Sequence, residues 1–154
     1  MGYLVKRTEN KIVIPTMNSD HLQLAKRAGE YLMTTPPVQM TTSHVIHGGM
    51  YLRTIVIPAG IAVVGVMIKI PTTVIINGKI TFYVGDSTIE IDGYEIIPAR
   101  AGRQQIVVAI EDTSVTMVFP TEATTVEEAE MEFTDEWTEL FSRNDENEIN
   151  ITGE

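Results

Sequence analysis

The sequence predicts a mainly β fold, a β-sandwich or a small barrel, with a helical segment on each side of it. Short runs rich in Val, Ile, Thr, Tyr and Phe recur between residues 48 and 120, and these side chains suit a pleated, half-buried surface. Turn residues separate the runs and no helical period interrupts them, which is typical of a sandwich or barrel of short strands. The predicted strands are Leu52–Ile57, Ile61–Ile70, Thr73–Ile76, Lys79–Val84, Ser87–Ile91, Tyr94–Ile97, Gln105–Ile110 and Ser114–Phe119.

Length and composition are those of one domain with a sizeable core. The chain has 154 residues, of which 44% are hydrophobic, and that share is enough to fill one core. We divide the chain into an arm and helix at residues 1–44, the barrel at residues 45–120 and an acidic segment at residues 121–154. The sequence has no cysteine, so it offers neither a disulfide nor a thiolate metal site.

The first part of the chain predicts a short strand and one helix. Lys11–Pro15 is expected to be an edge strand that the proline ends. Asn18 and the residues after it offer helix caps, and the helix is predicted over Asp20–Met33. Its narrow apolar stripe consists of Leu22, Ala25, Gly29 and Leu32. The stiff Pro36-Pro37 stretch is expected to hold this arm away from its own barrel, so that it reaches a neighbouring subunit.

Turn chemistry predicts the connections within the β-region. Residues 41–49 are expected to form a loop that enters the first strand. Asn77-Gly78 and Asp92-Gly93 are the strongest hairpin signals, because such pairs adopt the positive φ angles that two-residue turns require. Gly85-Asp86 marks a further turn.

The segment after Pro120 predicts a helix and a tail. Thr125 and Glu128 form a capping box, and the helix is predicted over Thr125–Phe141, with a second cap at Thr134-Asp135 that divides it. One helical face carries Val126, Ala129, Phe133, Trp137 and Leu140, joined by Phe141. We expect this face to pack on the barrel, and the alternative is an oligomer contact, because Trp and Phe are common interface anchors. Residues 144–154 have the composition of a disordered tail.

The net charge of −10 is concentrated at the C-terminal end of the chain. Residues 120–154 carry a charge of −11, residues 45–119 carry −1 and residues 1–44 carry +2. An acidic segment repels nucleic acid, because nucleic-acid binding depends on cationic contacts to phosphate. No apolar run reaches the length of a membrane span. We therefore expect neither nucleic acid nor a membrane among the partners.

Two histidines, His44 and His47, are the candidate metal ligands. Their H-x-x-H spacing could supply two imidazoles, but a catalytic zinc or iron site needs a third ligand, and no Asp or Glu lies close in the sequence. We expect them instead to hydrogen-bond to the backbone of a loop. No nucleophile, acid–base pair or phosphate-binding loop is identifiable, so the sequence predicts no catalytic residue and no enzyme.

Arg100 and Arg103 are the candidate residues for holding an anion or a carboxylate. They flank Gly102 in a predicted loop, and a guanidinium suits such a partner. The alternative is that they lie at the surface or in an interface. The candidate interface residues are Trp137, Phe141, Phe133, Arg100 and Arg103.

Two stretches of the β-region resemble the two motifs of the cupins. Motif one falls on residues 65–78, and motif two falls on Gly93, Pro98, Gly102 and Gln105. The resemblance implies a jelly-roll β-barrel in which motif histidines bind a metal. Ile68 and Ile70, or the nearby Lys69 and Thr72, stand where motif one has histidines, and Gln105 stands where motif two has one. Because apolar side chains cannot coordinate a metal, we expect no transition metal and no cofactor.

A closer resemblance is to small cupin-like proteins encoded by tailed phages. It covers about residues 44–133 and rests on the order of five segments, which are residues 49–53, 57–60, 101–103, 109–113 and 121–130. It implies a phage or prophage protein in the virion or the host cytoplasm, which works with other phage structural proteins. The predicted function is a non-catalytic structural or assembly protein. The alternatives are a small-molecule-binding cupin and a metal-dependent cupin enzyme that uses His44 and His47.

The resemblance also implies self-association, because cupin-like barrels commonly pair. The sequence carries two helical segments, although one would be enough to close an open end of a barrel. Trp137 and Phe141 supply a large apolar area on the second of them. Closed, symmetric homo-oligomers are the commonest oligomeric outcome, and we expect one here.

Overall fold

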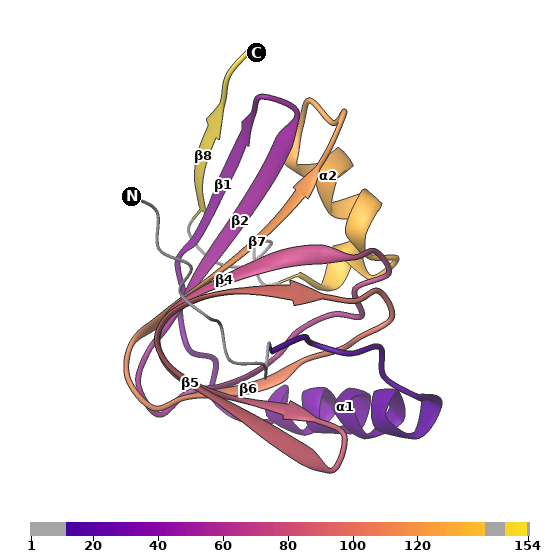
Figure 1. Cartoon of the computed structure of the whole chain (residues 1–154), viewed down its shortest axis with the longest axis vertical. Coiled ribbons are helices and arrows are strands. Elements are labelled where there is room, and N and C mark those ends of the chain that lie inside the picture. The colour runs from indigo at the N-terminus through magenta and orange to yellow at the C-terminus, as the bar shows by residue number, and fades with distance from the viewer. Residues whose placement is uncertain (1–11, 141–146, 154) are drawn as a thin grey trace, which may run out of the picture.

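The computed structural model describes residues 12–140 and 147–153, and in this part of the chain one mixed sheet curls on itself between two helices (Figure 1). Its elements are α1 (Ser19–Leu32), β1 (Thr42–His47), β2 (Met50–Ile57), β3 (Ala62–Val64), β4 (Thr72–Val84), β5 (Ser87–Ala99), β6 (Ile106–Ala109), β7 (Thr113–Pro120), α2 (Val126–Phe133), the 3₁₀ turn η1 (Trp137–Glu139) and β8 (Asn147–Ile151). The predicted mainly β fold with a helical segment on each side is confirmed.

The sheet closes on itself through one long strand, β4. The strand order is β3-β6-β4-β7-β2-β1-β8, and β5 pairs with β4. On one side β4 pairs with β5 over its whole length. On the other side its first half pairs with β7 and its second half with β6. One strand therefore takes part in two sheet segments, which produces the half-barrel seen in Figure 1.

The two predicted hairpins at Asn77-Gly78 and Asp92-Gly93 are wrong, because β4 and β5 run through them. Gly78 lies directly opposite Gly93 in the β4–β5 register. Gly78 has φ of 146°, and its Cα faces the backbone of Thr113, so the glycine allows a close approach of β7 and not a turn. The chain reverses instead at Gly85-Asp86, between β4 and β5. That predicted turn is confirmed.

Two segments without predicted structure are strands. Residues 42–47, predicted as part of a loop, form β1, which pairs antiparallel with β2. The predicted boundary between residues 44 and 45 therefore falls inside a strand. Residues 147–151, predicted as part of a disordered tail, form β8, which pairs parallel with β1. The free edge of β1 supplies the backbone partners that the polar composition of the tail did not reveal.

One predicted strand is mostly irregular. Of Ile61–Ile70, only Ala62–Val64 is a strand, and Ile68 forms an isolated bridge with Arg103. The backbone between them hydrogen-bonds to other elements, because Gly65 N–H donates to Gln105 O at 3.0 Å and Lys69 N–H donates to Phe133 O at 2.9 Å. Contacts with the loop before β6 and with the end of α2 replace a regular ladder here.

The first helix packs on its own barrel. The Asn18 side chain caps α1 by accepting a hydrogen bond from His21 N–H at 2.8 Å, and the predicted helix is confirmed to within one residue at each end. Ala25 is fully buried, and Gly29 lies against Val64 of β3. The expectation that the arm stands away from the barrel is therefore wrong. Of the predicted strand Lys11–Pro15, the described residues contribute one bridge, Ile14 with Ala99, and Lys11 lies outside the described part.

The second helix is shorter than predicted. Thr125 Oγ1 accepts a hydrogen bond from Glu128 N–H at 3.2 Å, as the capping box requires. The helix ends at Phe133, because Thr134 is extended and its hydroxyl accepts a hydrogen bond from Glu136 N–H. Trp137 then lies in η1. The predicted second cap at Thr134 is confirmed. Of the predicted helical segment Thr125–Phe141, the α-helix covers Val126–Phe133, and Phe141 lies outside the described residues.

Two groups of buried side chains fill the inside of the curl. The first lies among β2, β4, β5 and β6 and is aliphatic, apart from Phe82. The second lies between α2 and the strands β1, β2 and β7, and it includes Tyr51, Phe119 and Phe133. Figure 1 shows α1 and α2 at opposite ends of the molecule, so each helix covers a different end of the curl.

Candidate functional site

The two stretches that resemble cupin motifs are neighbours in the structure. Ile68 N–H donates to Arg103 O at 2.7 Å, and Gly102 N–H donates to Ile68 O at 2.8 Å. Ile68 is buried in the core group that includes Phe133, and Ile70 and Trp137 pack against the same group. The first-motif positions therefore present aliphatic side chains to the interior.

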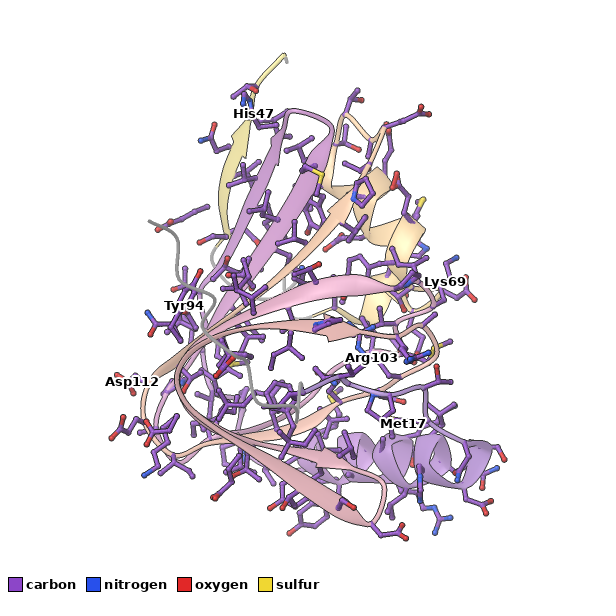
Figure 2. The ribbon with its side chains drawn as sticks, in the orientation of Figure 1. Met17, His47, Lys69, Tyr94, Arg103 and Asp112 are labelled. Atoms are coloured by element: carbon purple, nitrogen blue, oxygen red, sulfur yellow. The ribbon has the colours of Figure 1, made fainter. Side chains whose placement is uncertain are left out.

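Arg103 is a buried cation at this junction. Only 1% of its surface is exposed. Its Nη1 donates to Arg100 O at 2.8 Å, and its Nη2 donates to Thr72 Oγ1 at 2.7 Å. Burial lowers the pKa of Arg103 to about 10, so the guanidinium stays charged at neutral pH. Backbone and hydroxyl oxygens accept hydrogen bonds from the two terminal nitrogens, while the buried Nε has no hydrogen-bond partner among the described residues. Figure 2 shows the residue on the side of the barrel that faces Met17.

The candidate interface residues differ in how far they are buried within the chain. Phe133 and Arg103 are each 1% exposed. Trp137 is half-buried against the core group beneath α2. Arg100 is exposed. Phe141 lies outside the described residues.

The two candidate metal ligands point to opposite faces of β1. Thr42, His44 and Ile46 are buried, while His47, three residues after His44, is exposed, as strand alternation requires. The His47 ring hydrogen-bonds to Thr152 Oγ1 at 2.5 Å, at the far end of β1 and β8 (Figure 2). The predicted partners of both histidines, loop backbone groups, are replaced here by side chains. The pair does not converge on one point.

The ring of His44 is held between two side chains. Its Nε2 lies 2.8 Å from Asn147 Oδ1, and its Nδ1 lies 2.7 Å from the Tyr51 hydroxyl. Because Asn147 Oδ1 can only accept, Nε2 carries the proton and donates it. Nδ1 then accepts from the Tyr51 O–H. Both ring nitrogens are engaged, which leaves neither of them a lone pair directed at a metal.

Tyr51 connects this histidine to a buried ion pair. Arg53 Nη1 lies 3.3 Å from Glu130 Oε2, and the two side chains are 10% and 2% exposed. The Arg53 guanidinium also lies over the Phe133 ring, 5.9 Å from its centre. Burial raises the pKa of Tyr51 to about 12, and Arg53 offsets part of that rise. The hydroxyl is therefore protonated at neutral pH and acts as a hydrogen-bond donor, not as a base.

This buried polar cluster, which we define as His44, Tyr51, Arg53, Glu130 and Asn147, joins four elements. His44 lies on β1, Tyr51 and Arg53 on β2, Glu130 on α2 and Asn147 on β8. Alternation on β2 directs Tyr51 and Arg53 to the interior, where both are buried. The cluster locks α2 and β8 to the sheet, and its geometry is that of a structural network rather than of an acid–base pair.

Sequence reasoning singled out only His44 from this cluster. The signal that was available is the Y-x-R pattern of β2, since an arginine on the inward face of a strand requires a buried carboxylate or equivalent partner. Its partner Glu130 is one of many acids in the C-terminal segment, and Asn147 lies in the stretch with the composition of a disordered tail. Residue type alone therefore marks neither of them as a buried partner.

Removal of the Tyr51 hydroxyl is expected to lower the stability of the fold. Tyr51→Phe leaves His44 Nδ1 buried without its donor, which costs about 1–3 kcal/mol.

The contribution of Tyr51 to the stability of the fold depends on pH. In the unfolded chain Tyr51 ionises near pH 10, and in the folded chain only near pH 12, so its contribution is complete below pH 10 and is lost as the pH rises from 10 to 12.

Urea unfolding at pH 8 and pH 11 measures both effects. The stability gap between the native chain and Tyr51→Phe should narrow by about 1.4 kcal/mol at pH 11, since one pKa unit corresponds to that free energy. The other titrating groups are common to both proteins and cancel in this difference. A gap that is equal at the two pH values would contradict the raised pKa.

In residues 12–140 and 147–153, no three His, Asp or Glu side chains come together in a metal-binding arrangement. A shallow surface depression is lined by Gly49, Pro120, Thr121, Glu122 and Glu132. Within these same ranges, no helix combines the length and the apolar character needed to cross a membrane.

Comparison with known proteins finds similarity in structure only. No family model matches the chain, and no curated protein matches it. A cupin superfamily protein from Desulfitobacterium hafniense has 12% sequence identity and a TM-score of 0.47, over 74% of this chain and 100% of that chain. A protein from Shewanella frigidimarina that contains a cupin-2 domain has 10% identity and a TM-score of 0.41, over 64% and 98%. A DMSP lyase from Ruegeria pomeroyi has 9% identity and a TM-score of 0.42, over 82% and 79%. The similar structures thus include both cupin-domain proteins and an enzyme.

Proposed function

We propose that this chain is a non-catalytic structural or assembly protein of a phage or prophage particle, built on a cupin-like barrel that holds no metal. It works in the virion, and in the host cytoplasm before assembly. Its partners are further copies of itself and other phage structural proteins, and neither nucleic acid nor a membrane is among them. The resemblance of residues 44–133 to cupin-like phage proteins supports the phage assignment.

One observation carries the non-catalytic part of the proposal. At the junction of the two motif-like stretches, the interior positions hold Ile68 and Ile70, which pack against an aromatic core. His44 has both ring nitrogens engaged by Tyr51 and Asn147. Side chains that fill a barrel and satisfy one another support a scaffold, because catalysis requires groups that remain available to a substrate.

A second observation supports self-association. On the outer side of the curl, one region of the sheet consists of β1, β2, β7, the first half of β4 (residues 73–77) and the part of β5 that pairs with it (residues 94–98). The side chains of this region that alternate with core residues are uncharged, and none is buried within the chain. The apolar members include Val45, Leu52, Val56, Ile75, Ile96 and Val118. A surface of this kind on a chain with a net charge of −10 matches the core of a protein–protein interface, where charged residues are depleted.

Mass spectrometry of purified particles tests the assembly role. Particles from the phage or induced prophage that encodes this chain should contain it in a fixed ratio to the other structural proteins. Particles prepared from a strain with the gene deleted are the control. Normal, infectious particles without the protein in either preparation would contradict the proposal.

Sedimentation of the purified chain tests self-association through the outer sheet face. Val56→Lys/Ile96→Lys should convert the oligomer to a 17.1 kDa monomer, because two charges would have to be desolvated in the interface. The control is Tyr31→Lys/Met33→Lys at the C-terminal end of α1, which changes the net charge equally at residues that are 69% and 82% exposed. A native chain that sediments as a monomer at micromolar concentration would overturn this part of the proposal.

A further inference from the structure

Strand β8 lies at one end of the sheet, and its outer edge has no strand partner within residues 12–140 and 147–153 (Figure 1). At the other end of the strand order, α1 packs on β3, where Gly29 lies against Val64. Proteins commonly protect an exposed edge with Lys or Pro, but β8 contains neither, and Glu148 is its only charged residue. The edge of β8 is therefore suited to pairing with another extended chain.

Two isoleucines of β8 present both backbone groups and side chains at this edge. Thr152 N–H donates to Ile46 O of β1 at 3.1 Å. Because successive residues of a strand alternate in direction, Ile149 and Ile151 direct their N–H and C=O groups away from β1. Their side chains lie beside those of His44 and Ile46 on the same side of the sheet. His44 and Ile46 are buried, but Ile149 and Ile151 are 58% and 43% exposed, so an apolar row continues past the chain's own core.

We infer that the β8 edges of two copies of this chain pair antiparallel about a two-fold axis at Ile149, and that this pairing joins oligomers formed through the outer sheet face into a larger assembly. The inference rests on the self-association in the proposed function. Ile149 then lies opposite the second copy's Ile149, and the two residues exchange two N–H···O bonds. Ile151 lies opposite the second copy's Asn147, whose backbone groups face the same edge.

The charge of Glu148 favours this register over its neighbour. With the axis at Ile149, Glu148 lies opposite the second copy's Asn150, so a carboxylate meets an uncharged amide. An axis at Glu148 would set the two carboxylates directly across the ladder, where like charges destabilise the pairing. An axis at Asn150 would pair less of the strand, because Asn147 would then lie opposite Gly153. The strand is thus complementary to itself, as an isologous contact between two copies requires.

This edge contact is expected to depend on the outer-face contact. A strand of five residues forms only a marginal two-stranded pair in water. Oligomers held by the outer face carry at least two β8 edges, and where two edges engage together, the second pairing gains from a high effective concentration. The monomers expected for Val56→Lys/Ile96→Lys should therefore remain monomers at micromolar concentration.

A disulfide between two copies tests the pairing and its register. The chain has no cysteine of its own, and across a hydrogen-bonded antiparallel pair the two Cα atoms lie about 5.5 Å apart, which a disulfide can span. Ile149→Cys should therefore give a disulfide-linked dimer under mild oxidation. Ile151→Cys is the matched control, because in this register the two copies of residue 151 lie about 14 Å apart along the strands, and it should stay reduced. Equal linkage of both variants, or no linkage of Ile149→Cys, would overturn the inference.

Sedimentation of Ile149→Pro tests the contact without a cross-link. Proline removes an N–H that faces the free edge and none that bonds to β1, so the sedimenting mass should fall at least about twofold, because each edge contact joins two oligomers. Ile149→Val is the control, since it keeps the N–H and a β-branched apolar side chain, and its mass should equal that of the native chain. An unchanged mass for Ile149→Pro would overturn the inference but leave the outer-face contact, which Val56→Lys/Ile96→Lys tests separately.

Discussion

Replacement of Glu130 by leucine is expected to cost about 3–5 kcal/mol of unfolding free energy, which is the cost of leaving one charge of a buried pair without its partner. Glu130 is 2% exposed, and its carboxylate lies 3.3 Å from the Arg53 guanidinium. In Glu130→Leu the arginine remains inside the core group beneath α2, where water cannot replace the carboxylate. Urea unfolding measures the loss as a lower midpoint concentration, while the slope of the unfolding free energy against urea concentration should stay unchanged.

The double variant Arg53→Met/Glu130→Leu distinguishes an unpaired charge from lost packing. With both charges replaced by apolar side chains of similar size, no desolvated ion remains, so the double variant should be more stable than Glu130→Leu alone. The exposed pair Lys69 and Asp135 is the matched control, with side chains 37% and 79% exposed. Asp135→Asn should cost less than about 1 kcal/mol. Additive losses from the two single changes would show that Arg53 and Glu130 are not coupled.

Gly78→Ala is expected to destabilise the fold by about 3 kcal/mol or more. A Cβ at this position would lie 2.7 Å from Thr113 Cα and 2.8 Å from Asp112 O, and it would collide with Thr113 Oγ1. These are mainly backbone atoms of the segment that enters β7, so relief requires β4 and β7 to separate. Overpacking costs about 1–3 kcal/mol, and the φ of 146° adds backbone strain of about 1–3 kcal/mol.

Gly93→Ala is the matched control, since Gly93 lies directly opposite Gly78 on β5. It also has a positive φ, of 104°, but a Cβ there meets no atom within 4 Å. Only the backbone strain of about 1–3 kcal/mol should remain. Thermal or urea unfolding of both variants gives the comparison. If the two substitutions cost the same, the close approach of β7 does not explain Gly78.

The sequence predicted the β-strands best where one face is buried. The alternation in Ser114–Phe119 and the apolar runs in Leu52–Ile57 reappear as β7 and β2 with small changes of boundary. Both helices were predicted from caps, and Asn18 and Thr125 do cap them. These are local signals, because a cap or an alternating strand depends on residues within a few positions of one another.

Turn signals failed where a distant segment determines the backbone. Asn77-Gly78 has the composition of a tight turn, but β7 packs against Gly78 and the ladder with β5 continues through it. Residues 147–151 are polar enough to be read as a tail, but the open edge of β1 pairs with them. In both cases the partner lies more than 30 residues away, and no local pattern records it.

Some features of the candidate site could be predicted from the sequence, and others depend on the tertiary structure. From the sequence, we could locate the two motif-like stretches and the side chains that stand in them, because these follow from residue identity and order. Only the tertiary structure showed that His44 and His47 face opposite sides of β1, that Arg103 and Phe133 are buried, and that Arg53 meets Glu130 across 77 residues. The mainly β class and the two helical segments were determined by the sequence itself, because alternation, helical period and caps are local properties. The pairing of buried charges was decided by the fold, since which residues lose their water together depends on how the sheet curls and where α2 closes it.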